Sequence, residues 1–190
     1  ACECDACIEA FDTYGADSAV VIKFCNETAA EMRNIFAAKG LNRDFKLVFF
    51  AYEAYENAPV TEKNGKRVAT DKSLICDDNV SVFYAPIAMK YTVPMDSDKY
   101  EGKNLRFLQT FKDWQILCND VFVWIYSSNF SHYLVTYDVF DSLQANLKIF
   151  KDLGAKYMQD LGQYNVSSSC VWTNLTGYLQ AELQWNCSLD

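Results

Sequence analysis

One stretch limits the possible folds of this chain more than any other. It begins as an unbroken apolar run at residues 121–126, turns polar at Ser127, and carries the only histidine of the chain, His132. A short run that is apolar on both alternating faces is typical of a parallel strand covered by helices on both sides. In parallel α/β folds, ligands bind at the carboxyl ends of the strands. The stretch therefore predicts a buried central strand whose carboxyl end forms the rim of a site.

The rest of the chain alternates between helical and strand patterns. Asp17 and Ser18 are candidate caps for a first helix that runs to Lys39, and Gly40 is its expected left-handed stop. The other predicted helices cover residues 104–118, 141–153 and 174–186. The predicted strands cover residues 46–52, 80–85, 121–126 and 155–159, and loops are expected at 1–16, 57–78 and 86–103.

Helical spacing also predicts which side chains point inward. The first helix is expected to bury the apolar and small residues that recur every three or four positions, Val21, Phe24, Cys25, Thr28, Met32, Ile35 and Phe36. By the same rule the last helix is expected to bury Leu175, Tyr178, Leu179 and Leu183.

The order of the elements indicates a fold. Alternating strands and helices imply right-handed crossovers and a mainly parallel sheet. A complete (β/α)₈ barrel of the TIM type needs about 250 residues, whereas this chain has 190 residues and four predicted strands. We therefore expect residues 1–190 to form a single domain or a half domain, the carboxyl-terminal half of such a barrel and a fragment of a longer chain. The alternative is a small open sheet that is complete in itself.

A half barrel would expose apolar surface. It leaves two strand edges and an open apolar layer, which favour pairing with another element. The expected partner is the missing amino-terminal half, whether on the same chain or cleaved, or a second chain.

Composition excludes several classes of function. A net charge of −8 argues against a nucleic-acid partner, because phosphate binding needs a basic surface. No run of 18 apolar residues occurs, so no membrane span is expected. No glycine-rich phosphate loop occurs, and no cofactor is expected. The aromatic content of 15% suits both a core with wide flat surfaces and the stacking of sugar rings.

Three of the eight cysteines are closely spaced. Cys2, Cys4 and Cys7 form a Cys-x-Cys-x-x-Cys pattern among acidic residues. This pattern has three interpretations: a structural role as thiols or a disulfide, a Zn²⁺ site with a fourth ligand from elsewhere, or incidental clustering. Three further cysteines lie in apolar or helical contexts and are expected to pack as small hydrophobic thiols, Cys25, Cys118 and Cys170.

Polar and aromatic residues gather at or just beyond the predicted strand ends. They are Glu53, Tyr55, Tyr126, Asn129, His132, Asp160, Gln163 and Tyr164. Sugar sites use carboxylates for acid–base chemistry, amides for hydroxyl groups and aromatic rings for stacking. Because glycosidases usually need two carboxylates, Glu53 and Asp160 are the candidate catalytic pair, and the other six are candidate substrate-binding residues.

Each of these residues also has a plainer interpretation. Glu53 is equally explained as an exposed acid at a strand end, Asp160 as a turn residue and His132 as a hydrogen-bonded structural residue. No serine or cysteine nucleophile motif accompanies His132, so a catalytic triad is not expected.

The sequence from Trp124 onward resembles a bacterial family of unknown function whose members look like glycoside hydrolases of the α-glucuronidase and β-hexosaminidase type. That family carries Trp-Asp-Tyr followed by Asn-Phe-Ser/Ala-His-Tyr-Leu, then Glu-Gln-Gly-Asn-Tyr, and a late helix close to Ala-Tyr-Leu-x-Ala-x-Leu-x-Trp-Asn. The matching residues are Trp124, Tyr126, residues 129–134, Gly162, Tyr164, Tyr178, Leu179, Ala181, Leu183, Trp185 and Asn186. The family's Cys-x-Cys-x-x-Cys is matched by Cys2, Cys4 and Cys7, and departures occur at Ile125, Asp160, Leu161 and Gln163.

The resemblance implies a fold and a function. It implies that the four strands are strands five to eight of a barrel, and that the principal acid pair lies upstream, at the end of strand four. It further implies glycoside hydrolysis of a glycan, with this chain supplying residues that orient the substrate, in a secreted, periplasmic or surface-associated protein. Two other hypotheses stay open: a non-catalytic carbohydrate-binding protein, and a structural or assembly module.

Overall fold

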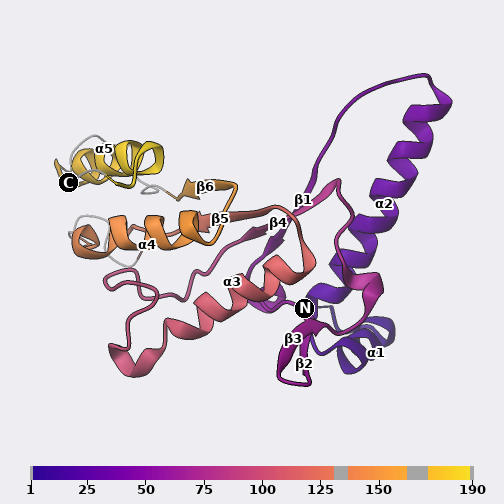
Figure 1. The fold of residues 1–190 in the computed structure, drawn as a ribbon, viewed down its shortest axis with the longest axis horizontal. Helices are drawn as coiled ribbons and strands as arrows, with labels where there is room; N and C mark the ends of the chain where they lie inside the picture. Colours follow the sequence, from indigo (N-terminus) through magenta and orange to yellow (C-terminus); the bar gives the residue numbers. More distant parts are fainter. Residues whose placement is uncertain (1, 131–136, 162–170, 189–190) are drawn as a thin grey trace. The chain divides into compact units, whose positions relative to one another are not determined.

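The fold is a mixed α/β architecture built on a four-stranded parallel sheet with flanking helices. The computed structural model describes residues 2–130, 137–161 and 171–188. The sheet has the strand order β1-β4-β5-β6, where β1 is Leu47–Ala51, β4 is Val80–Tyr84, β5 is Val121–Ile125 and β6 is Tyr157–Asp160 (Figure 1). The four predicted strands are therefore confirmed, and closure into a (β/α)₈ barrel stays a prediction.

The chain divides into two compact units. The first comprises residues 1–85 and 110–122, and the second comprises residues 86–109 and 123–190. Strand β5 contributes its first two residues to the first unit and its last three to the second.

In the first unit, helix α2 contacts strands β1 and β4. Helix α2 is Ser18–Ala38, and the two strands pair in parallel from Leu47 opposite Val80 to Ala51 opposite Tyr84 (Figure 1). The other elements with residues in this unit are α1 (Asp5–Tyr14), β2 (Val60–Lys63), β3 (Lys66–Ala69), α3 (Leu105–Leu117) and the short 3₁₀ helices Glu53–Tyr55 and Lys72–Leu74. Gly40 has φ +65° after α2, which confirms the predicted left-handed stop.

Two segments that we expected to be loops contain regular structure. Helix α1 lies in residues 1–16, and it buries none of its residues, so no apolar stripe marked it in the sequence. Strands β2 and β3 lie in residues 57–78 and form an antiparallel hairpin. Its turn is Asn64-Gly65, with φ +53° and +71°, the positive values that a tight hairpin turn requires. The Asn-Gly pair was the available sign of a hairpin turn. It was overlooked because both flanking strands are polar and lack an alternating apolar pattern.

The buried stripe of α2 differs from the predicted one. The buried residues are Ser18, Ala19, Ile22, Cys25 and Ala29, so of the predicted inward residues Cys25 is buried, and Val21, Thr28, Met32 and Phe36 are half-buried. Phe24 is 67% exposed and Ile35 is also exposed. Mostly small side chains face the rest of the unit, which lets the helix lie close to the strands, whereas the prediction favoured large apolar ones. Asp17 occupies the N-cap position, as predicted, but its side chain makes no capping hydrogen bond, and Ser18 Oγ donates to the Asn57 carbonyl oxygen instead.

Within the first unit, the two faces of the sheet differ in burial. Phe49 and Tyr84 are buried against α3, where their rings contact Trp114 and Phe111. On the opposite face, Phe50 is 49% exposed.

We call that opposite face the open aromatic face, defined by Val48, Phe50, Phe83 and Phe122. Phe50 stacks on Phe83 with 5.3 Å between ring centroids, and Phe83 meets Phe122 edge-on at 5.9 Å. Val48 is exposed, and Phe83 and Phe122 are half-buried. The expectation that the strand at 121–126 is buried on both faces is therefore wrong at Phe122.

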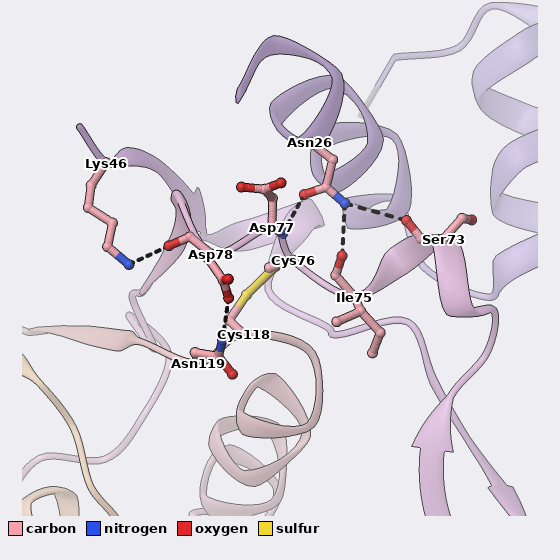
Figure 2. Close-up of a disulfide and its surroundings, with 9 residues drawn as sticks. All are labelled: Asn26, Lys46, Ser73, Ile75, Cys76, Asp77, Asp78, Cys118 and Asn119. Atoms are coloured by element: carbon pink, nitrogen blue, oxygen red, sulfur yellow. Dashed lines mark hydrogen bonds between the residues drawn. A yellow bond between two sulfur atoms is a disulfide. The ribbon is translucent and has the colours of Figure 1, made fainter. Parts of the chain in front are cut away.

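A disulfide between Cys76 and Cys118 joins the segment before β4 to the residue after α3 (Figure 2). Cys118 was expected to be a free thiol, so this is a correction. The Cys76 backbone N–H also donates to the Leu117 carbonyl, at 2.7 Å between nitrogen and oxygen.

Side chains hold the segment around this disulfide from two directions (Figure 2). The Asn26 side-chain amide of α2 donates to the Ile75 carbonyl at 2.9 Å and accepts from the Asp77 backbone N–H at 2.9 Å. Lys46 Nζ donates to the Asp78 carbonyl, and Asn119 Nδ2 donates to the Asp78 carboxylate. The disulfide thus lies in a segment that is already fixed by hydrogen bonds.

In the second unit, helix α4 (Phe140–Asp152) contacts helix α5 (Val171–Trp185) (Figure 1). Helix α4 buries Leu143, Leu147 and Phe150, which recur at helical spacing. Helix α5 begins three residues before its predicted start. Its inward face is half wrong, because Leu179 and Leu183 are half-buried whereas Leu175 and Tyr178 are exposed.

The segment 86–104 of the second unit has little regular structure beyond the 3₁₀ turn Tyr100–Gly102, and buried polar side chains hold it. Asn104 accepts from the Lys90 N–H and donates to the Lys90 carbonyl, both at 2.9 Å. Asn146 of α4 accepts from the Met95 N–H at 2.6 Å, and Ser142 donates to the Tyr91 carbonyl. Across the described parts of both units, no helix has the length and apolar composition that crossing a bilayer requires.

Candidate functional site

The candidate site lies at the carboxyl ends of β5 and β6. Asp160 is the last residue of β6, and Ser127 follows β5 by two positions. The Leu161 N–H donates to the Ile125 carbonyl at 2.9 Å, which brings the two strand ends level. Gln180 reaches the same point from α5. We call Ser127, Asp160 and Gln180 the Asp160 cluster.

The hydrogen bonds of the Asp160 cluster converge on the carboxyl group. The Ser127 backbone N–H donates to Oδ1 of Asp160 at 3.2 Å, and the Ser127 hydroxyl donates to Oδ2. The Gln180 side-chain amide donates to Oδ2 of Asp160 and to the Ser127 hydroxyl oxygen. An ionised carboxylate is a pure acceptor, so these three donors fix its orientation.

Burial changes the acidity of this carboxyl group. Burial raises the pKa of Asp160 to about 6, and the hydrogen bonds from Ser127 and Gln180 act in the opposite direction without cancelling it. A carboxyl group of this kind exchanges its proton close to neutral pH, as a general acid must.

This raised pKa predicts how stability depends on pH. The folded chain holds a proton on Asp160 at pH values where the unfolded chain, with the ordinary value of 3.8, has lost it. The contribution of Asp160 to the free energy of unfolding therefore falls as pH rises from about 4 to about 6. Between pH 4 and pH 8, we expect the free energy of unfolding of Asp160→Asn to rise by about 2.5 kcal/mol relative to that of the unmodified chain, measured by urea unfolding at both pH values.

The control for this measurement is Asp138→Asn, which removes an exposed carboxylate from the same unit. Its stability should follow that of the unmodified chain at both pH values. If Asp160→Asn also follows the unmodified chain, the raised pKa is wrong.

Aromatic side chains pack next to the end of β5. Tyr126 is buried, and its ring contacts those of Tyr91 and Phe130, with centroids 6.3 and 6.0 Å away. The Tyr91 hydroxyl donates to the Pro86 carbonyl at 3.0 Å. Asn129 is half-buried. The predicted contacts of Tyr126 and Asn129 with a substrate stay predictions.

The second candidate carboxylate lies in the other compact unit. Glu53 opens the 3₁₀ helix Glu53–Tyr55 just after β1, is exposed, and has φ +50°, a value uncommon for a residue other than glycine. Tyr55 is half-buried. Burial and the neighbouring Glu53 carboxylate raise the pKa of Tyr52. The structure does not bring Glu53 and Asp160 together within one unit, so their role as a catalytic pair stays a prediction.

Three other candidate residues, His132, Gln163 and Tyr164, lie outside the described residues. Cys170 does too. Their predicted roles therefore stay predictions.

Two members of the Asp160 cluster, Gln180 and Ser127, were not among the predicted site residues. Gln180 belongs to the half-buried stripe of α5, with Thr176, Leu179 and Leu183. An amide at helical spacing within an apolar stripe was the available signal, because a buried amide needs a hydrogen-bonding partner.

A second group of reactive side chains lies at the start of α1. The sulfur atoms of Cys2, Cys4 and Cys7 all lie within 4.8 Å of one another, and those of Cys2 and Cys4 are 3.4 Å apart. The fold therefore brings all three thiols together, and the three interpretations of their pattern stay predictions.

Comparison with known proteins gives a family and no function. No curated protein matches the chain, and no solved structure does. The sequence model of one family matches residues 1–190, from the cysteine cluster through the Asp160 cluster to the end of α5. The chain belongs to this family, which is described as a domain of unknown function (DUF4838).

Proposed function

We propose that this chain is part of a glycoside hydrolase and that the Asp160 cluster binds the substrate and serves its proton transfer. The observation that carries the proposal is a carboxyl group with a pKa of about 6, held at the carboxyl end of a parallel strand. Glycosidases protonate the leaving oxygen with a carboxylic acid whose pKa burial has raised.

The hydrogen-bonding capacity of the cluster suits a sugar. Protonated Asp160 donates to an oxygen, and ionised Asp160 accepts from a hydroxyl group. Ser127 and Gln180 supply a hydroxyl and an amide beside it. Sugar hydroxyl groups both donate and accept, so a site that combines these groups matches them.

Glycoside hydrolysis by this mechanism needs a second carboxyl group. Glu53 is the candidate within the chain. In the complete barrel that we propose, the principal acid pair lies at the end of strand four, as the resemblance to hexosaminidase-type enzymes implies. Asp160 then orients the substrate and shares its proton with the sugar, instead of acting as the sole acid.

The open aromatic face supports the half-barrel architecture that this proposal uses. The inner side of a (β/α)₈ barrel is filled by side chains from all eight strands, so half a barrel exposes part of its own filling. Phe50 on β1 is half exposed while Phe49 beside it is buried. We propose that the remaining strands of the barrel cover this face.

The disulfide supports an oxidising compartment. Disulfides persist in secreted, periplasmic and cell-surface proteins and are rare in the reducing cytosol. The Cys76–Cys118 bond thus agrees with secretion or export of a glycan-degrading protein.

The test is hydrolysis of aryl glycosides by the full-length protein. Two probes follow from the resemblance, 4-nitrophenyl N-acetyl-β-hexosaminide and 4-nitrophenyl α-glucuronide. We expect Asp160→Asn to lower kcat/KM by roughly 10- to 100-fold on the probe that is turned over, because it removes on the order of 1–3 kcal/mol of transition-state stabilisation.

Asp138→Asn is again the matched control and should retain full activity, since this exposed carboxylate is not part of the Asp160 cluster. Equal activity of Asp160→Asn and Asp138→Asn would falsify the proposed role of the cluster.

Non-catalytic carbohydrate binding is the second candidate function. It is favoured by the composition of the Asp160 cluster, in which Asp160 is the one carboxylate that Ser127 and Gln180 contact among the residues that the structure describes. A binding protein would retain sugar affinity and turn over neither probe, with affinity that falls in Asp160→Asn.

A further inference from the structure

The three cysteines at the start of α1 are arranged by the helix itself. Cys4 precedes the helix with extended backbone angles, φ −74° and ψ 154°. Its carbonyl accepts from the N–H groups of Cys7 and Ile8 at 2.9 and 3.0 Å, which forms the first turn. Residues three apart share one side of a helical turn, so Cys7 lies over Cys4. Cys2 lies at the same place, with its sulfur 3.4 Å from that of Cys4.

We propose that Cys2, Cys4 and Cys7 bind a single thiophilic d¹⁰ cation, Zn²⁺ or Cu⁺, through their three sulfur atoms. This site is independent of the proposed glycosidase function. Among the residues that the structure describes, no other group of three or more histidine, cysteine or acidic side chains has its ligand atoms gathered closely enough to hold a metal ion.

The spacing of the sulfur atoms fits such a cation. A Zn–S bond is about 2.3 Å long, so two thiolates of a tetrahedral site lie roughly 3.8 Å apart. The three sulfur atoms here lie within 4.8 Å of one another, and the closest pair is at 3.4 Å. Rotations about the Cα–Cβ bonds close a difference of this size. Cys2 and Cys4 are exposed and Cys7 is half-buried, so their side chains have room for these rotations.

The surroundings are electrostatically suitable. Three thiolates and Zn²⁺ carry a net charge of −1, which the positive end of the helix dipole stabilises at the start of α1. Glu3 and Asp5 flank Cys4 and attract a cation from solution.

The number of thiols also favours a cation over a disulfide. A disulfide consumes two cysteines and leaves the third unpaired, whereas a cation uses all three. The other two free cysteines among the described residues, Cys25 and Cys187, are buried and belong to neither arrangement.

The binding step balances simply. Each thiol that becomes a ligand releases one proton to solvent, and no oxidant or reductant takes part. Cu⁺ is a soft cation that prefers thiolate ligands, and three sulfur ligands complete its coordination. Tetrahedral Zn²⁺ keeps one further position, filled by water. The bound cation would fix the segment before α1 to the first turn of the helix.

The experiment titrates the reduced, metal-free chain with Zn²⁺ against a chromophoric chelator, and in a separate anaerobic arm with Cu⁺ against a Cu⁺-specific chelator. We expect one equivalent to bind, and the arm with the tighter binding identifies the cation. Cys4→Ser should weaken binding on the order of 100-fold, since it removes a direct ligand, more than the loss of an outer-shell partner does. Cobalt substitution should give thiolate charge-transfer absorption that diminishes with each cysteine replaced.

Cys25→Ala is the matched control, because it removes a buried thiol from the same unit and should leave metal binding unchanged. Helix α1 buries none of its residues, so the serine variants should remain folded, which circular dichroism checks. The proposal is overturned if neither cation binds stoichiometrically, or if the triple serine variant binds as well as the unmodified chain. A Cys4–Cys7 or Cys2–Cys4 disulfide in the freshly isolated protein, with no metal bound, overturns it as well.

Discussion

Replacing Trp114 by alanine should lower the free energy of unfolding by about 3–5 kcal/mol, the usual cost of emptying a large buried aromatic site. Trp114 is fully buried in the first unit, and its ring meets Phe49 at 5.6 Å between centroids. Its indole N–H donates to the Glu56 carbonyl at 2.8 Å. The variant therefore loses packing against β1 and also leaves a buried carbonyl without that donor.

Two controls separate these losses. Trp114→Phe keeps most of the ring and removes the donor, so it should cost about 1–2 kcal/mol. Trp185→Ala removes a side chain that is 93% exposed and should cost less than about 0.5 kcal/mol. Urea unfolding followed by far-ultraviolet circular dichroism measures all three. A cost for Trp114→Ala no larger than that for Trp185→Ala would show that the core is assigned incorrectly.

Removal of the disulfide with Cys76→Ala/Cys118→Ala should cost about 3–4 kcal/mol. The bond joins cysteines separated by 42 positions, and a loop of that length loses this much entropy in the unfolded chain when it is closed. Both cysteines are buried, so Ala also loses some packing.

Reduction provides the comparison for the disulfide. The unmodified chain in a strong thiol reductant should approach the stability of the double variant, and the variant itself should not respond to the reductant. A variant as stable as the oxidised chain, or an unmodified chain that is indifferent to reduction, contradicts a stabilising bond.

The strands could be predicted because their apolar runs are local signals. Residues 47–51, 80–84 and 121–125 are short runs rich in β-branched and aromatic side chains, and each forms a strand of the sheet. Helix α1 could not be predicted in this way, because Ile8 and Phe11 remain exposed and no buried stripe exists. The burial of Phe122 was overestimated because an apolar run does not reveal whether both faces of its sheet are covered.

The candidate site was predictable only in part. Asp160 could be placed from the rule that polar residues at strand ends form sites, and it lies at the end of β6. Its partner Gln180 lies twenty positions away, and the pairing of Cys76 with Cys118 spans 42 positions. Long-range pairings of this kind depend on the packed fold, and one sequence carries no local mark of them.

The path of the irregular segment 86–104 is determined largely by three hydrogen-bonding side chains. Its hydrogen bonds to Asn104, Ser142 and Asn146 end on main-chain atoms of Lys90, Tyr91 and Met95. Bonds to main-chain atoms do not depend on which side chains the loop carries. They do depend on the number of residues between the bonded positions. The path of this segment is thus set largely by Asn104 at its own end and by two side chains of α4, and along the rest of the segment the number of residues matters more than their identity.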